Sequence, residues 1–222
     1  MKVLELFAGT RSIGLAFESK HHDVFSVDWD DKFVNIDLYI DIELLDVDDI
    51  IRLFGIPDVI WASPDCTTYS LAGISHHRGE GYSPKSEYAE KSDRLNIHLW
   101  SLIKRFKELN PKLIYYVENP MGTYRKMPWV KDKTRYTVTY CQYGDTRMKP
   151  TDIFTNHPEP KFKPMCHNGD TCHQSAPRGS RTGTQGLLKV DRSRIPQALC
   201  DHIVSISEAL EELEEEELEE MK

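Results

Sequence analysis

The sequence predicts an α/β domain built on a mostly parallel sheet. Four apolar runs typical of buried strands recur along the chain, namely VLELF, VFSVDW, DVIWAS and LIYYVEN. The stretches between them are long enough to hold helices or crossover connections, which parallel strands require. A chain of 222 residues suits one domain with its own core and at most a small appendage.

Helices are indicated where apolar side chains recur at helical spacing. The first is expected to begin near Ile13, after the turn that follows the first strand run. A long helix is predicted over residues 91–110, and Asn110-Pro111 stops it. Its apolar face consists of Leu95, Leu99, Leu102, Ile103 and Phe106. A last helix is expected to dock through Leu199, Ile203, Ile206, Leu210 and Leu213, and to fray at its acidic end.

The chain is predicted to divide into three parts. Residues 1–156 carry the alternating strands and helices, and residues 193–222 carry the last helix, which returns to that domain. Between them, residues 157–192 form a short segment of loops or a small subdomain, because Gly, Pro, Ser and Arg are frequent there. The formal net charge of −8 belongs to the C-terminal tail, since residues 208–222 hold nine of the 36 acidic residues and one of the 28 basic residues. The neutral remainder can still bind nucleic acid where basic residues cluster.

Cysteine content and the N-terminus favour an intracellular protein. Five cysteines, an odd number, argue against a disulfide scaffold and for reduced thiols or metal ligands. The chain enters the first strand run directly after Met1, without a signal peptide or an apolar stretch long enough to cross a bilayer. We therefore expect a soluble, cytoplasmic protein with no membrane partner. Association with the nucleoid, or action inside a phage-infected host cell, is compatible with this expectation.

The stretch ELFAGTRSIG at residues 5–14 is typical of a strand that runs into a ligand-binding turn. Such turns lie at the carboxyl edge of a parallel sheet, where Gly9 would let the backbone approach a cofactor. Asp28 follows the second strand run and is placed to hydrogen-bond a ribose diol, with Trp29 as a wall for a nucleoside. Asp41-Ile42 could contact an adenine ring. The alternative is that Asp28 and Asp41 are solvated strand-end acids and Trp29 an ordinary aromatic residue.

Cys66 and Glu118 are the candidate catalytic pair. Cys66, in SPDCTTYS, follows one strand run, and Glu118, in VENP, ends the next. A thiolate is a good nucleophile, and a carboxyl group at a buried strand end can share a proton, because burial raises its pKa. The two side chains are expected to face one pocket. The alternatives are a small buried hydrophobic side chain for Cys66 and a helix cap or ion-pair partner for Glu118.

Taken together, ELFAGTRSIG, SVDW, IDI, SPDCTTYS, VENP and QYGDTRMKPTDIF resemble the cytosine-5 DNA methyltransferases in order and rough spacing. The resemblance covers residues 3–155 and, more weakly, SRIPQAL. It implies a Rossmann-like fold that uses S-adenosylmethionine, with residues 1–156 as the catalytic domain and residues 157–192 as a recognition segment. In that family the cysteine adds to C6 of cytosine, the glutamate protonates or hydrogen-bonds N3, and C5 then accepts the methyl group.

The resemblance also assigns the remaining site residues. Besides Cys66 and Glu118, it implies that Asn119, Arg147 and Lys149 take part in catalysis or position the base. The implied cofactor site consists of Phe7, Ala8, Gly9, Thr10, Asp28, Trp29, Asp41, Ile42 and Pro64.

The sequence departs from the family pattern in three of these motifs. Arg11 and Ser12 stand in a motif that is usually richer in glycine, which implies a differently shaped cofactor loop. Asp65 replaces the proline that usually precedes the cysteine. In the family's arginine motif, Arg147 or Lys149 substitutes, and Thr151 falls near the position of the last arginine.

DNA is the expected partner, most simply a duplex from which the target cytosine is extruded. The loop over residues 67–94, with His76, His77, Arg78 and Lys85, is long enough to close over an extruded nucleotide. A basic cluster is expected to contact phosphates, with solvated loop charge as its alternative; it consists of Arg178, Arg181, Lys189, Arg192 and Arg194. Because the recognition segment is short, the same chemistry on RNA, single-stranded DNA or a nucleotide stays open. A catalytically weak relative that binds cofactor or nucleic acid for regulation, or as a decoy, is the other alternative.

The motif MCHNGDTCH predicts a structural zinc site in the recognition segment. Cys141, Cys166, Cys172 and His173 would supply a Cys3His ligand set. A metal would explain how so small a subdomain stays folded. The spacing is not that of a standard zinc finger, so the alternative is a loop without metal.

Overall fold

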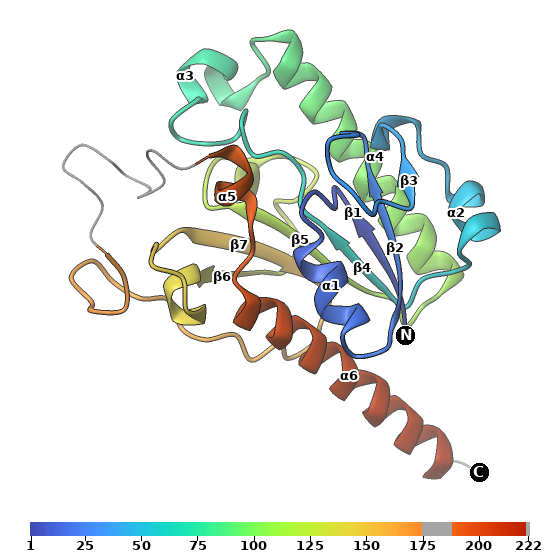
Figure 1. Cartoon of the computed structure of the whole chain (residues 1–222). Coiled ribbons are helices and arrows are strands. Elements are labelled where there is room, and N and C mark those ends of the chain that lie inside the picture. The colour runs from blue at the N-terminus through green and yellow to red at the C-terminus, as the bar shows by residue number, and fades with distance from the viewer. Residues whose placement is uncertain (175–187, 221–222) are drawn as a thin grey trace.

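The computed structural model describes residues 1–174 and 188–220 and confirms the α/β fold. A seven-stranded sheet has the order β3-β2-β1-β4-β5-β7-β6 (Figure 1). Its strands are β1 (Lys2–Leu6), β2 (Asp23–Asp28), β3 (Leu38–Tyr39), β4 (Val59–Ala62), β5 (Ile114–Pro120), β6 (Arg135–Thr139) and β7 (Pro150–Thr155). The four strands expected from apolar runs are β2, β1, β4 and β5, which adjoin in that order.

One strand of the sheet runs against the others. Strand β7 lies between β5 and β6 and is antiparallel to both. In its register Glu118 is opposite Ile153 and Asn119 is opposite Asp152. The reversed strand therefore places the chain around residue 150 beside the end of β5, where the candidate glutamate lies.

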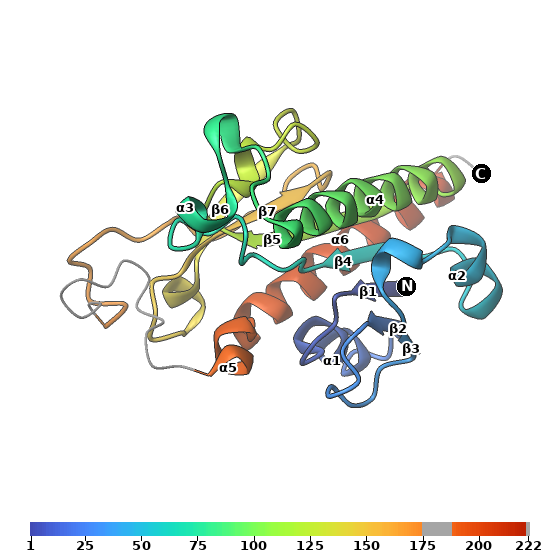
Figure 2. The same ribbon diagram turned by 90° about the horizontal axis from the view of Figure 1, so that it is seen from above.

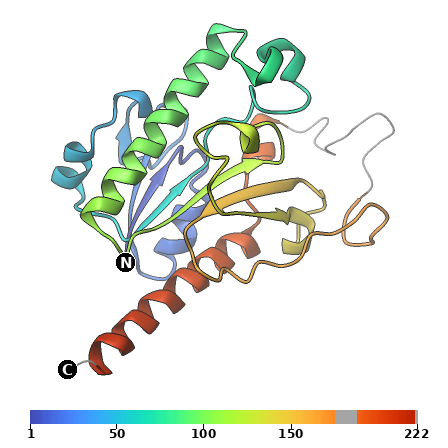
Figure 3. The ribbon, with the colours of Figure 1, turned by 180° about the vertical axis from the view of Figure 1, so that it is seen from behind.

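Helices α2 (Val47–Leu53) and α4 (Glu87–Leu109) cover one face of the sheet (Figure 3). The core on this side joins residues of both helices to strand residues, including Leu99 and Phe106 of α4 and Ile60 of β4. Helix α4 begins four residues earlier than predicted, because the Ser86 hydroxyl caps it by accepting the Ala89 N–H at 3.2 Å.

Helices α1 (Ser12–Glu18) and α6 (Gln197–Glu220) cover the opposite face (Figure 1). Leu199 and Ile203 are fully buried there against Phe17 and strand residues, so the predicted docking face of the last helix is confirmed in its first half. Leu213 is 56% exposed, which shows that the acidic half continues past the core. None of the helices in the described ranges combines the length and apolar character needed to cross a membrane.

Several short elements complete the chain. They are η1 (Ile42–Leu44), α3 (Ile74–His77), η2 (Glu80–Tyr82), η3 (Tyr124–Lys126), η4 (Tyr140–Tyr143) and α5 (Lys189–Ser193). Seen from above, α3 and α5 lie toward the end of the molecule that also holds β6 and the chain that follows it (Figure 2). Between residues 157 and 174 the chain has neither helix nor strand. The predicted boundaries at 156 and 192 remain predictions.

Candidate active site

The candidate residues gather at the carboxyl edge of the parallel strands. The turn Phe7–Arg11 follows β1, Asp28 ends β2, Cys66 lies four residues beyond β4, and Glu118 and Asn119 lie near the end of β5. Because β2, β1, β4 and β5 are neighbours and parallel, their ends meet along one edge. The sheet itself thus brings together residues that are more than 100 positions apart.

Asp28 organises the turn after β1. Its carboxylate accepts the Gly9 N–H at 2.8 Å through Oδ2 and the Asp30 N–H at 2.9 Å through Oδ1. Gly9 has a φ of 50°, and a Cβ there would point at the ring of Phe33, 3.7 Å away. The absent side chain therefore leaves space between the turn and Phe33, a residue that the sequence patterns did not single out. Asp28 is a structural acid as well as a candidate ligand.

The other predicted cofactor residues divide between open and buried positions. Trp29 is 65% exposed, so its ring is free to stack on a planar ligand. Asp41 forms an ion pair with Lys91, whose Nζ lies 2.6 Å from Oδ2, and it also caps η1. Ile42 is a core residue, 1% exposed. Of this group, Trp29 offers the largest free surface.

The remaining cofactor candidates shape the backbone. Phe7 has a φ of 56°, Ala8 is buried and donates its N–H to Val27 at 3.1 Å, and the Thr10 hydroxyl lies 3.0 Å from that of Ser12. Pro64 is buried beside Cys66.

Arg11 is accommodated in the turn by pointing inward. It takes a left-handed conformation with a φ of 56°, and its Nε donates to the Ser26 hydroxyl at 2.8 Å. Its guanidinium also pairs with Glu18 and approaches Glu5, which the Gly14 N–H bonds at 2.8 Å. Arg11 thus occupies a left-handed position in this turn, and its side chain hydrogen-bonds residues that lie beneath the turn.

The loop that carries Cys66 is held from β5. The Asn119 Nδ2 group donates to the Pro64 carbonyl at 3.0 Å, and the Tyr69 N–H donates to the Cys66 carbonyl at 3.1 Å. The Asn119 Oδ1 atom is buried and has no hydrogen-bond partner among the described residues. A buried acceptor without a donor costs free energy, so a group that donates a hydrogen bond to Asn119 Oδ1 would be stabilised there.

Arg78 has a structural position in the loop over residues 67–94. It is only 4% exposed, and its guanidinium donates to Thr68 and, at 2.8 Å, to Asp93. Lys85 donates to a carbonyl of the same loop. Arg78 therefore holds this loop together, because its donors already bond protein atoms.

Glu118 lies at the centre of a buried hydrogen-bond chain. The Tyr140 hydroxyl donates to its Oε1 at 3.0 Å, and the Ser63 hydroxyl also bonds it. Ser63 in turn accepts the Trp61 indole N–H at 2.8 Å. Burial raises the pKa of Glu118 above its ordinary value, although the hydroxyls and Lys149 oppose the shift. Its carboxyl group therefore holds a proton more readily than a free glutamate.

Lys149 is the cation of the site, and Arg147 is not. The Lys149 ammonium lies 4.4 Å from the centre of the Tyr140 ring and donates to the Arg192 carbonyl at 2.9 Å. Its charge acts on both Glu118 and Cys66. Arg147 instead forms an ion pair with Asp145, two residues away.

The Cys66 thiol is protonated at rest. Burial raises its pKa to about 11, the charges of Asp65 and Glu118 add to the shift, and Lys149 opposes it. A thiol in this state needs help to become a nucleophile. Lys149 is the group in the site that favours the thiolate.

Replacing Lys149 should change the titration of Cys66. In Lys149→Met we expect the thiol pKa to rise above its value of about 11, because the cation that stabilises the thiolate is gone. Lys149→Arg should keep the value near that of the unchanged protein. The measurement is the rate of alkylation of Cys66 by iodoacetamide against pH, followed on the Cys66 peptide by mass spectrometry. Equal profiles in both variants would contradict this role.

The basic cluster is described only in part, and the predicted metal ligands lie apart from this group. Arg178 and Arg181 fall outside the described residues, Lys189 begins α5, and Arg192 and Arg194 are exposed. The metal candidates Cys141, Cys166, Cys172 and His173 come together beside η4. Sequence patterns missed Tyr140 and Ser63, although each adjoins a residue that they did single out.

We compared the chain with protein families and with individual known proteins. No protein-family profile matches the chain. A Frog virus 3 protein designated a probable DNA (cytosine-5)-methyltransferase is 26% identical over 225 residues, covering 93% of this chain and all of that protein. The resemblance to the cytosine-5 DNA methyltransferases that the motifs carry is thereby confirmed.

Solved structures support the fold. A protein described as a DNA modification methyltransferase encoded within an Escherichia coli prophage aligns with a TM-score of 0.50 at 18% identity, over 70% of this chain and 46% of its own. A methyltransferase of Entamoeba histolytica aligns with a TM-score of 0.51 at 13% identity, over 77% and 57%. The fold is thus the Rossmann-like methyltransferase fold. The chain spans about half the length of these solved structures.

Proposed function

We propose that this chain is an S-adenosylmethionine-dependent methyltransferase that acts on C5 of cytosine in DNA. The observation that carries the proposal is the placement of Cys66, Glu118 and Lys149. A thiol, a buried carboxyl group and an ammonium act electrostatically on one another at the carboxyl edge of the sheet. The similarity to the Frog virus 3 protein over nearly the whole chain supports the same reaction.

The residues after β1 and β2 fit S-adenosylmethionine. The adenosine part needs a planar surface and a hydroxyl acceptor, which the exposed Trp29 ring and the Asp28 carboxylate supply. The lack of a side chain at Gly9 lets a ligand approach the backbone of this turn closely. When bound, S-adenosylmethionine supplies an electrophilic methyl group on a sulfonium centre.

The thiol and the carboxyl group together activate the base. Cys66 loses its proton to solvent, and the thiolate sulfur forms a bond to C6 of cytosine. The electron pair of the C5–C6 double bond forms a C4–C5 double bond, and the pair of the C4–N3 double bond moves onto N3, which takes the proton of Glu118. C5 is then electron-rich and can accept a methyl group. Loss of the C5 proton to a base re-forms the double bond, breaks the bond between sulfur and C6, and returns the N3 proton to Glu118.

The surroundings of Glu118 suit this exchange. Burial keeps its carboxyl group protonated at a higher pH than in water, as a proton donor to N3 requires. Tyr140 and Ser63 stabilise the carboxylate that remains after transfer, so the proton can move in both directions. Lys149 favours both the thiolate and the carboxylate.

A methyl-transfer assay tests the proposal. Labelled S-adenosylmethionine is incubated with duplex DNA, single-stranded DNA, RNA or dCMP at equal cytosine concentrations, and the products are hydrolysed and separated. Label in 5-methylcytosine from duplex DNA is the expected result. If 5-methylcytosine carries label only when RNA, single-stranded DNA or dCMP is supplied, that molecule and not duplex DNA is the substrate. No label from any of them, with cofactor binding intact, would favour a protein that only binds.

Trp29→Ala should weaken cofactor binding without disturbing the fold. Loss of the stacking surface is expected to cost about 1–1.5 kcal/mol, or about tenfold in affinity. Trp29 is a better choice than Asp28, whose removal would also release the Gly9 N–H. Val34→Ala is the control, because Val34 is 72% exposed nearby in the sequence. Calorimetric titration with S-adenosylhomocysteine measures the effect, and equal affinities in the two variants would remove Trp29 from the site.

A further inference from the structure

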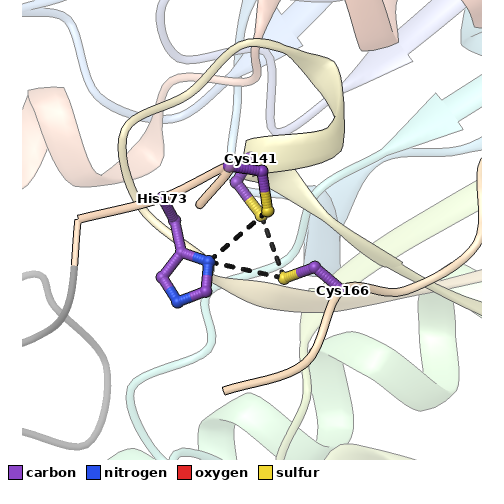
Figure 4. A group of neighbouring side chains, drawn as sticks. Cys141, Cys166 and His173 are labelled. Atoms are coloured by element: carbon purple, nitrogen blue, oxygen red, sulfur yellow. Dashed lines mark hydrogen bonds between the residues drawn. The ribbon is translucent and has the colours of Figure 1, made fainter. Parts of the chain in front are cut away.

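Three thiols and an imidazole converge beside η4, outside the proposed catalytic site. Cys141 lies within η4, and Cys166, Cys172 and His173 come from the chain after β7. Figure 4 shows Cys141, Cys166 and His173 pointing toward one another. The sulfur, or Nδ1 or Nε2, atoms of the four residues all lie within 4.8 Å of one another. Two segments that are separate in sequence thus present soft ligands to one centre.

The spacing of these atoms resembles that of a tetrahedral site. Zinc bonds sulfur at about 2.3 Å and imidazole nitrogen at about 2.0–2.1 Å, so ligand atoms lie about 3.6–3.8 Å apart. Cys172 Sγ is 3.6 Å from Cys141 Sγ, and the Sγ atoms of Cys166 and Cys172 are 3.7 and 3.5 Å from the His173 Nδ1. The sulfurs of Cys141 and Cys166, 3.1 Å apart, lie closer than in an ideal tetrahedron. All are well beyond a disulfide bond of about 2.05 Å.

We propose that Cys141, Cys166, Cys172 and His173 bind one structural zinc ion. Three sulfurs and one nitrogen form a complete tetrahedral set, which leaves no open position for a substrate or a reactive water. Cys141 and Cys166 are buried, so the site is sheltered on the protein side, and Cys172 is exposed, so it is accessible to metal from solvent. The ion holds the fold and takes no part in methyl transfer.

The zinc ion fastens the segment over residues 157–174 to the edge of the sheet. This segment has no helix or strand of its own, and hydrogen bonds from separate points along it join it to the rest of the described chain. The Cys166 N–H donates to the Thr139 hydroxyl at 3.1 Å, and the Lys163 N–H donates to the Tyr143 hydroxyl at 2.9 Å. A short segment without a core of its own commonly depends on a metal for its structure.

The same ion braces the active site through its neighbour in sequence. Cys141 directly follows Tyr140, whose hydroxyl bonds Glu118 at 3.0 Å. Fixing Cys141 therefore fixes η4 and the ring of Tyr140. This consequence rests on the proposed catalytic role of Glu118, whereas the metal site itself does not.

Metal content and ligand variants test the site directly. Protein purified without chelator should contain about one zinc per chain by elemental analysis. Cys172→Ser and His173→Ala should lower that content severalfold, or raise the rate of zinc loss to a chelator at least tenfold. His167→Ala is the matched control, because His167 is an exposed histidine of the same loop outside the ligand set, and it should retain the metal.

Cobalt gives a second readout that does not depend on activity. Replacing the zinc with cobalt(II) should give the intense visible absorption of tetrahedral cobalt with thiolate ligands, and Cys172→Ser should weaken it. Zinc far below one per chain together with no such absorption would overturn the proposal. So would full zinc in both Cys172→Ser and His173→Ala, or a Cys141–Cys166 disulfide in the metal-free protein as isolated.

Discussion

Cys66→Ser is expected to abolish methyl transfer to cytosine, with a fall in rate on the order of 10⁴-fold or more. A serine hydroxyl at this position is a far weaker nucleophile toward C6, because nothing in the site ionises it. Affinity for S-adenosylhomocysteine should stay unchanged, since Cys66 is proposed to react with the base, whereas Asp28 and Trp29, which are proposed to hold the adenosine, lie at the end of β2. The assays are labelled methyl transfer to duplex DNA and calorimetric titration of the same preparation.

The control for this variant is Cys200→Ala. Cys200 is a buried cysteine of α6 that packs in the core between that helix and the sheet. Its removal should preserve methyl transfer wherever the protein remains folded. Methylation that persists in Cys66→Ser would rule out this thiol as the nucleophile.

Glu118→Gln is expected to slow methyl transfer by about 10²- to 10⁴-fold, because an amide of nearly the same shape cannot give N3 a proton. The same change should lower the pKa of the Cys66 thiol, since the charge of Glu118 contributes to its rise to about 11. Alkylation of Cys66 at a fixed alkaline pH should therefore become faster while methylation becomes slower. Both are measured on one preparation, by iodoacetamide labelling and methyl-transfer kinetics.

Glu5→Gln is the matched control. Glu5 is also a buried carboxyl group on a strand of this sheet, and burial raises its pKa to about 7. It bonds Gly14 and Ser26 and lies 3.9 Å from Arg11 in the turn after β1, and it does not contact the residues around Cys66. At saturating S-adenosylmethionine, its replacement should leave the turnover of folded protein within a few-fold. Equal losses in the two variants would mean that Glu118 acts through stability and not through proton transfer.

The sequence predicts the part of the site that the sheet positions. Turns at the carboxyl ends of parallel strands lie on one edge, so Gly9, Asp28, Cys66 and Glu118 can be grouped from the strand pattern alone. The early start of α4 could also have been predicted, because Ser86 precedes a helical pattern and is a favoured capping residue.

Other features depend on contacts that no local pattern encodes. Tyr140 reaches Glu118 only because β7 inserts between β5 and β6 in the antiparallel direction. Arginine is a residue type that commonly binds phosphate, yet the guanidinium of Arg78 is buried and hydrogen-bonds Thr68 and Asp93. Lys149 and Arg147 are equivalent in the sequence motif, and only the partners of each side chain distinguish them.

The proposed metal site and the proposed active site together suggest how a chain of 222 residues could catalyse methyl transfer to cytosine. The two groups proposed as catalytic, Cys66 and Glu118, follow or lie in adjacent strands of the sheet, which places both of them. The segment over residues 157–174 lacks secondary structure, and the proposed zinc ion would take the place of a core there.

The proposed reaction depends on a covalent bond between the sulfur of Cys66 and C6 of cytosine. A duplex that carries 5-fluorocytosine tests it, because fluorine replaces the C5 proton whose loss would release the enzyme. Incubation with this duplex and S-adenosylmethionine should give a stable adduct, and mass spectrometry of the digested complex should place it on the peptide that contains Cys66. An adduct on another cysteine, or none from protein that methylates the unmodified duplex, would contradict the account.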